Sequence, residues 1–209
     1  FSGDDRISGG RFSVSFAVPK DINYSDQSGL INAFAINDDH TLTAHGYTDK
    51  FIVGGSDIAQ NDSVGPSIYC YLNSPSFSNG DRVNSTPYFV AEVKDKDGIN
   101  ASGAGIGHDM QLIIDGKMET TYSLNENFQY DFGSYTSGST YYNIPQLEEG
   151  PHKLQFRAWD ILNNYSTAEL TFNVVTGQKP SFSIGCTNNP ARESTTLSLI
   201  HISEPTRPE

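Results

Sequence analysis

The chain has 209 residues, enough for one large or two small domains. Its formal net charge of −12 argues against a nucleic-acid partner, which needs clustered Lys and Arg, and no apolar run approaches the roughly 18 residues that cross a bilayer. The chain is rich in turn and strand formers, with 19 Gly, 11 Tyr and 12 Phe. This composition predicts an all-β fold.

Residues 1–64 are predicted to form a first β-sandwich module that is incomplete at its N-terminus. Apolar and polar residues alternate over Arg11–Val18, which predicts a half-buried strand. A second strand is predicted over Leu30–Ile36, where apolar residues occur on both faces, as in a strand between two layers. Shorter candidates are Leu42–Ala44 and Phe51–Val53. The polar segment after them marks a domain boundary.

Residues 65–176 are predicted to form an immunoglobulin-like β-sandwich, because short alternating strands follow one another at regular spacing. The expected strands are Ile68–Leu72, Tyr88–Lys94, Met110–Ile114, Glu119–Leu124, Phe128–Phe132 and Tyr141–Ile144. Asp115-Gly116 is a tight-turn dipeptide between two of them. No helix of useful length is expected.

A β-hairpin is predicted over Leu147–Val175. Leu154, Phe156 and Ala158 share one face of its first strand, and the residues between them are polar. The second strand repeats the pattern after a turn-rich break at 160–166. Each strand therefore has one wet face, and the apolar face has to pack on another sheet.

The C-terminal residues are predicted to begin a third β-domain over 177–196. The following segment, Leu197–Arg207, resembles the translation of a sequencing-library adapter. Residues 197–209 are therefore left out of the predicted fold.

The glycine-rich loop that follows Lys94 is the best candidate for a metal site. Asp95, Asp97, Asn100 and Asp109 offer oxygen ligands that calcium accepts, but their spacing does not match an EF-hand. The alternative is structural: glycines allow positive φ, and Asp or Asn side chains cap turns. The structural interpretation is favoured, and no cofactor is expected.

No catalytic constellation is predicted. Cys70 lies in an apolar strand pattern and His108 in a loop of the same module, so their pairing stays open, as does a Cys70–Cys186 disulfide. The remaining histidines outside the adapter-like segment, His40, His45 and His152, are expected to be exposed.

Trp159 falls on the polar face of its strand. It is either half of a sugar-binding aromatic platform with Tyr141 and Tyr142, or a cover for a sheet edge or a neighbouring domain.

Several motifs together resemble one family. They are Phe12–Asp21, Ile52–Gly55, Gly65–Asn73, Gly98–Asn100 with Gly105–Asp109, and Ala158–Asp160 with Asn163–Asn164. The combination is similar to the C-terminal region of the type IX secretion system sortases, which are gingipain-like cysteine peptidases of the Bacteroidota. Gly-Ile-Asn followed by Gly-Ile-Gly-His-Asp is its most specific element.

The resemblance implies a caspase-like peptidase domain, with a Cys–His dyad, upstream of Phe1 in the same polypeptide. No residue here matches that dyad. The implied function is a non-catalytic β-sandwich region at the cell surface or outer membrane, which braces the peptidase domain. Secreted cargo proteins and outer-membrane secretion components are further implied partners. The alternative is a cell-surface carbohydrate- or protein-binding module of another exported protein.

Overall fold

The computed structural model describes residues 3–20, 27–54, 62–103, 107–176, 181–186 and 197–203. Within these ranges every regular element is a β-strand, apart from one 3₁₀ turn, η1, at Met118–Thr120. The strand pairs are antiparallel except for one parallel pair, β4 with β11. The predicted all-β class is therefore confirmed. The described residues contain no helix with the length and apolarity to span a membrane.

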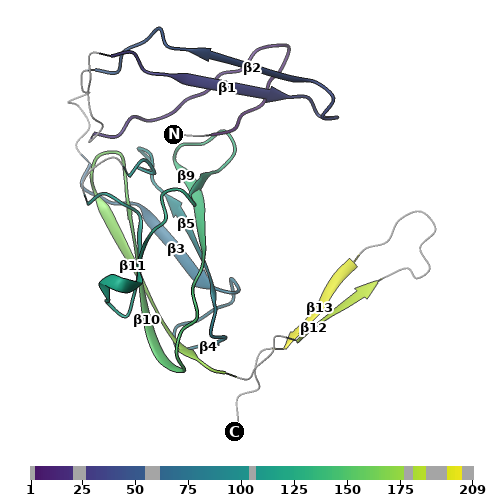
Figure 1. The fold of residues 1–209 in the computed structure, drawn as a ribbon, viewed down its shortest axis with the longest axis vertical. Coiled ribbons are helices and arrows are strands. Elements are labelled where there is room, and N and C mark those ends of the chain that lie inside the picture. Colours follow the sequence, from purple (N-terminus) through teal and green to yellow (C-terminus); the bar gives the residue numbers. More distant parts are fainter. Residues whose placement is uncertain are drawn as a thin grey trace.

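A two-sheet β-sandwich is built from strands between Ser67 and Val174 (Figure 1). The first sheet has the strand order β4 (Arg82–Val83), β11 (Tyr165–Val174), β10 (Gly150–Trp159), β6 (Gln111–Ile114) and β7 (Thr121–Ser123). The second has the order β3 (Ser67–Leu72), β5 (Tyr88–Lys94), β9 (Ser137–Asn143) and β8 (Gln129–Tyr130). The predicted boundaries near residues 64 and 176 stay predictions.

The core lies between these two sheets. The rings of Phe89 in β5 and Phe156 in β10 meet there with centroids 5.4 Å apart, and both side chains are fully buried. The other fully buried large side chains are Leu72, Ile99, Met110, Leu112, Ile114, Leu124, Ile144, Leu154, Val93 and Val174. Each sheet thus hides one face from water, as the alternation of its strands predicts.

Strands β10 and β11 form the hairpin predicted from the sequence. They pair in register from Gly150 opposite Val174 to Trp159 opposite Tyr165. Leu154, Phe156 and Ala158 are buried, and the residues between them are half-buried. The Asp115-Gly116 turn is also confirmed, because φ is +54° at Asp115 and +67° at Gly116. Such positive φ values match a tight turn to the twist of its strands.

The N-terminal residues form one small sheet of β1 (Ile31–Ile36) and β2 (Thr43–Thr48), which lies across one end of the sandwich in Figure 1. The strands predicted over Arg11–Val18 and Phe51–Val53 are wrong. Arg11 makes an isolated bridge to Ser8, and the rest of both segments is irregular. The apolar alternation is present, but no strand in the described part of the chain pairs with either segment.

Two further strands, β12 (Ser181–Cys186) and β13 (Leu197–Ser203), form an antiparallel hairpin with a register shift between Ser183 and Ile184. Strand β13 falls in the segment that the sequence analysis left out of the fold. Residues 187–196, predicted to continue the third β-domain, lie outside the described residues.

Candidate functional site

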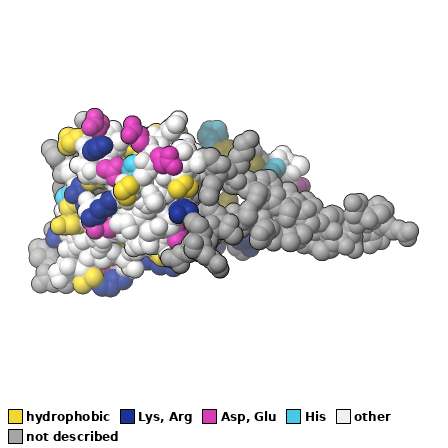
Figure 2. All heavy atoms as spheres, turned by 90° about the horizontal axis from the view of Figure 1, so that it is seen from below, with side chains coloured by type: hydrophobic (Ala, Val, Ile, Leu, Met, Phe, Trp, Pro, Cys, Tyr) yellow, Lys and Arg dark blue, Asp and Glu magenta, His cyan; other side chains and the backbone are white. Residues whose placement is uncertain are grey.

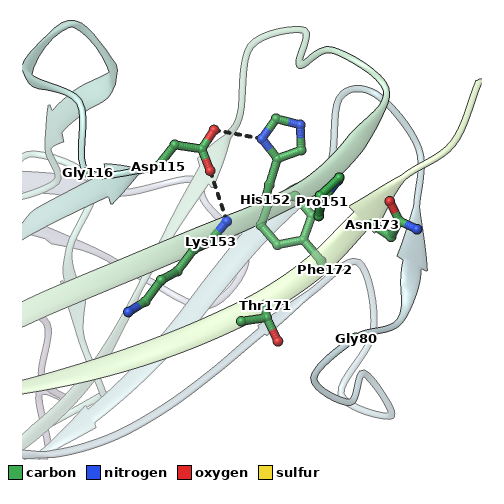
Figure 3. Close-up of a pocket in the computed structure, with 9 residues that line it drawn as sticks. All are labelled: Gly80, Asp115, Gly116, Pro151, His152, Lys153, Thr171, Phe172 and Asn173. Atoms are coloured by element: carbon green, nitrogen blue, oxygen red, sulfur yellow. Dashed lines mark hydrogen bonds and ion pairs between the residues drawn. The ribbon is translucent and has the colours of Figure 1, made fainter.

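A hollow of about 710 Å³ opens at the end of the sandwich where β10 begins and β11 ends (Figure 3). It is lined by Gly80, Asp115, Gly116, Pro151, His152, Lys153, Thr171, Phe172 and Asn173. Seen from below, this end carries acidic and basic side chains interspersed with hydrophobic ones (Figure 2). The hollow combines a carboxylate and an imidazole, which are the groups that acid–base chemistry uses.

Asp115 reaches this hollow because the tight turn after β6 points its carboxylate back toward β10. Asp115 Oδ2 lies 2.7 Å from His152 Nδ1, and Oδ1 accepts a 2.9 Å hydrogen bond from the Lys153 amide. The Lys153 ammonium turns away in Figure 3 and pairs with Glu169 at 2.9 Å. Burial raises the pKa of Asp115, but these two hydrogen bonds, together with the charge interactions with His152 and Lys117, outweigh burial and lower the pKa.

His152 is not placed to act as a base on a substrate. Its Nε2 lies 2.9 Å from the backbone oxygen of Glu148, which can only accept, so Nε2 carries a proton. Its Nδ1 faces Asp115, and its ring stacks on Phe172 at 5.6 Å. Both nitrogens are therefore used within the protein. The pair ties the start of β10 to the turn after β6, and this role is structural.

The opposite end of the sandwich is organised by Asp160, in the turn between β10 and β11. Its side chain is fully buried. Oδ1 accepts hydrogen bonds from the amides of Leu162 at 2.9 Å and Asn164 at 2.7 Å, and Oδ2 accepts one from Asn164 Nδ2 at 2.8 Å. This turn also holds its neighbours: Ile161 donates to the Gly98 carbonyl, and Asn164 Nδ2 donates to the Asp62 carbonyl.

The predicted metal loop lies beside this turn, and a lysine supplies its positive charge. Lys96 Nζ is 2.6 Å from Asp97 Oδ2 and 2.8 Å from Asp62 Oδ2. The hydrogen bond from Lys96 is the main cause that lowers the pKa of Asp62 to about 2, and the same contacts raise the pKa of Lys96. The loop thus ties the segment before the sandwich to the sandwich itself.

Two more of the candidate ligands, Asp95 and Asn100, make hydrogen bonds that shape the loop, and Asp109 follows it at the C-terminal side. Asp95 Oδ1 accepts from the amides of Asp97 and Gly98, at 2.8 and 3.1 Å. Asn100 is fully buried, and its Oδ1 accepts from the Ser102 amide and hydroxyl. No group of three or more His, Cys, Asp or Glu within the described ranges is arranged to hold a metal ion. Calcium binding stays a hypothesis, and residues 104–106 lie outside the described chain.

Cys70 lies in the four-stranded sheet, whereas His108 lies in a loop that packs on the other sheet. Cys70 in β3 packs half-buried against the core and is a free thiol. Its burial raises its pKa to about 11, so the thiol stays protonated at neutral pH. His108 instead packs against Trp159, with ring centroids 4.2 Å apart, and Trp159 belongs to the outer face of the other sheet. The two residues therefore form no dyad.

The aromatic platform considered for Trp159 is not formed with Tyr141 and Tyr142. Trp159 packs between His108 and Tyr165, whose centroids lie 4.2 and 5.0 Å away, and the Arg157 guanidinium lies 5.5 Å from its ring. Tyr141 instead packs on Tyr88 within the four-stranded sheet. Tyr142, also in that sheet, packs on Tyr122 in β7 of the other sheet. Trp159 lies on the outer face of an inner strand of its sheet, so within the described residues it neither forms this platform nor covers a sheet edge.

Sequence reasoning missed the partners of His152 and Asp160. His40 and His45 are exposed as predicted, but the side chain of His152 is only 12% exposed. Its partner Asp115 lies in a turn 37 residues earlier, so no local pattern connects the two. The turn-forming composition after Trp159 was the one available signal for Asp160.

The comparisons with known proteins include a match to a solved structure. The chain is similar to dimeric latent PorU from Porphyromonas gingivalis, with 39% identity, a TM-score of 0.56 and coverage of 90% of this chain. It spans only 18% of that PorU chain. An endo-beta-1,4-mannanase from Thermotoga petrophila matches 53% of this chain and 20% of its own, at 11% identity and a TM-score of 0.35, which is too weak to support an argument. No protein-family model and no curated protein matches.

Proposed function

This chain is a relative of the C-terminal region of PorU, and on that premise we propose that it is the non-catalytic β-sandwich region of a longer type IX secretion system sortase. In that protein it braces the peptidase domain at the cell surface, and presenting secreted cargo is a second role. Outer-membrane secretion components are further proposed partners. The hydrolytic chemistry belongs to residues outside this chain.

The observation that carries this proposal is the contact of residues 17–20 with the turn of the sandwich between β10 and β11 and with Gly98. Pro19 is buried, and the Lys20 amide donates a 2.9 Å hydrogen bond to the Ile161 carbonyl in the β10–β11 turn. Ala17 approaches Gly98 so closely that a Cβ at Gly98 would lie 3.1 Å from the Ala17 Cβ. A segment held in this way fixes the position of the sandwich relative to any domain that the segment also contacts. A brace requires such a fixed connection.

The side chains near the two ends of the sandwich support a structural role. The imidazole of His152 has both nitrogens engaged, and the Cys70 thiol has a raised pKa. Nucleophilic catalysis needs a thiol or hydroxyl activated by a free base. We therefore expect the purified chain to hydrolyse no peptide. Turnover that disappears with Cys70→Ala would contradict this.

The test of bracing uses the longer protein that contains this chain. Ala17→Glu places a long charged side chain against Gly98 and should loosen the docked segment, since overpacking costs about 1–3 kcal/mol. Removal of the C-terminal sorting domain from a cargo protein should become several-fold slower. Ser13→Glu adds the same side chain at an exposed position of the same segment and should leave the rate unchanged. Equal rates for both variants would refute bracing.

A second candidate function is carbohydrate binding by the outer face of the four-stranded sheet. Tyr69, Tyr88 and Tyr141 are 50%, 37% and 40% exposed there, and Tyr71 stands in the row that also holds Tyr141. Aromatic rings with polar tips stack on the apolar faces of sugars. Affinity electrophoresis in polysaccharide gels tests this: Tyr141→Ala should abolish any retardation, and Tyr165→Ala, on the other sheet, should not.

A further inference from the structure

The N-terminal residues leave a large apolar surface uncovered. Within residues 3–20 and 27–54, Pro19 is the only buried residue. The large hydrophobic side chains exposed there are Ile7, Phe12, Val14, Phe16, Leu30, Ile31, Phe34, Ile36, Leu42, Tyr47 and Ile52. We call this set the N-terminal apolar surface. Nearly every large apolar side chain in these residues is exposed, and apolar surface left in water is favourably covered by another surface.

The members of this surface that lie in the β1–β2 sheet point to both of its faces. Phe34 pairs with His45 and lies on the same face as Ile36 and Tyr47, because strand residues two apart point the same way. Ile31, with Ala33 and Ala35, points to the other face. Phe34 and Tyr47 are 71% and 72% exposed, and Ile31 is 39% exposed. The sheet therefore has apolar side chains on both faces and needs a layer against each.

The backbone of this sheet is also incomplete. It has two strands only, so within the described residues the outer edges of β1 and β2 present unpaired N–H and C=O groups. An isolated two-stranded hairpin is marginally stable in water, and open edges invite pairing with a further strand. The segment Arg11–Val18 adds a second sign of the same kind, because it has the alternation of a strand without a partner.

We infer that the N-terminal apolar surface is an interface with the remaining polypeptide of a longer PorU-like protein, which adds β-strands to the β1–β2 edges and covers both faces. The chain spans 18% of the PorU chain it resembles, so enough polypeptide lies outside it to supply those layers. The inference rests on the proposed function only in taking the chain as part of a longer protein. It assigns the interface to strand addition.

A second copy of this chain fits the surface less well. In a two-fold dimer each copy buries the same patch, so a dimer through one face of β1–β2 leaves the other face in water. The apolar residues on both faces would then not all be covered. Polypeptide that is continuous with the chain has no such symmetry constraint.

Hydrogen–deuterium exchange of the 209-residue chain and of the longer protein tests the inference. The amides of Ile31–Ile36 and Thr43–Thr48 should exchange rapidly in the chain alone and at least about tenfold more slowly in the longer protein. The amides of β10 and β11 are the internal reference and should be protected in both. Equal exchange of β1 and β2 in the two proteins overturns the inference.

A variant pair adds a test of side-chain burial. Phe34→Asp should raise exchange of β1 in the longer protein by about tenfold to a hundredfold, because a buried Phe is replaced by a charge. It should leave the isolated chain unchanged. Met118→Asp, at a residue that is 92% exposed on η1, should change neither protein. A chain that is dimeric by light scattering and becomes monomeric with Phe34→Asp would assign the surface to a second copy and overturn the inference.

These outcomes are separate from those of the bracing test. If β1 and β2 are protected from exchange in the longer protein and Ala17→Glu leaves the rate of cargo processing unchanged, the interface is supported and bracing is refuted. Slower processing by Ala17→Glu, with β1 and β2 unprotected, sustains bracing and refutes the interface.

Discussion

Asp160→Ala should destabilise the sandwich more than removal of any other single carboxylate among the described residues. The carboxylate is fully buried and accepts from two amides and one side-chain amide, at 2.7 to 2.9 Å. Each buried donor left without an acceptor costs about 1–3 kcal/mol. Because Leu162 and Asn164 are half-buried, water compensates in part, and we expect a loss of about 3–5 kcal/mol. A typical domain is stable by about 5–15 kcal/mol.

Asp160→Asn refines the same prediction. The amide oxygen still accepts from the Leu162 and Asn164 amides, but the new NH₂ faces Asn164 Nδ2, which is also a donor. One hydrogen bond is lost instead of three, and the expected cost is about 1–2 kcal/mol. Asp131→Ala, at an exposed position of the same sandwich, should cost less than about 0.5 kcal/mol.

Urea unfolding followed by tryptophan fluorescence measures these differences. Trp159 is the only tryptophan in the chain and precedes Asp160 directly, so its signal reports on this turn. A loss below about 1 kcal/mol for Asp160→Ala, or equal losses for Asp160→Ala and Asp160→Asn, would refute the reasoning. Either result would mean that the turn is held by packing and not by the carboxylate.

Three further outcomes are expected. The pKa of Asp115 is lowered in the folded state, so its stabilising effect is present above its unfolded pKa and is lost as the pH falls. The free energy of unfolding of Asp115→Asn should therefore fall less than that of the unchanged chain between about pH 5 and pH 3. Parallel plots of the free energy of unfolding against pH would contradict this. In a Cys186→Ser background, Cys70 should react with a thiol reagent at least about tenfold more slowly in the folded than in the unfolded chain, because burial raises its pKa to about 11 and the lower thiolate fraction outweighs the higher nucleophilicity of that thiolate; equally fast labelling of both states would contradict this. The melting midpoint should not change when a chelator replaces calcium, because Lys96 supplies the positive charge of the glycine-rich loop; a fall of several degrees with chelator would establish a calcium site.

The sandwich was predictable because the residue pattern within each strand indicates which of its faces is buried. The alternation of Leu154, Phe156 and Ala158 fixes which face of β10 is buried, and Asp115-Gly116 fixes a turn through positive φ. Both signals are local. Arg11–Val18 has the same alternation but forms no strand, because a strand also needs an edge to pair with. Periodicity records which face of a segment is apolar and says nothing about where its partner lies.

The same limit explains what was missed at the two ends of the sandwich. Asp115 and His152 meet because β6 pairs with β10 in one register, and that register brings Ile114 opposite Leu154. A shift by one residue would place them on opposite faces. The buried side chain of Asp160 likewise depends on neighbours from residues 62 and 98, which close around the turn only after the sheets have packed. Sequence patterns could therefore suggest Asp115, His152 and Asp160 as polar residues near turns, but not the contacts that each makes in the folded chain.

The difference between the closed sandwich and the open N-terminal sheet has a consequence for stability. The sandwich buries its large apolar side chains between two sheets, so it has the packing that independent folding requires. The β1–β2 sheet has no such core, and the segment 3–20 that precedes it is held to the sandwich at a few points, such as Lys20 with Ile161 and Asp4 with Gly133. In isolation this sheet should open at a low cost in free energy, whereas a longer protein should hold it closed. The contact of residues 17–20 with the sandwich is then the place where ordering of the N-terminal residues would stabilise the sandwich, and the reverse.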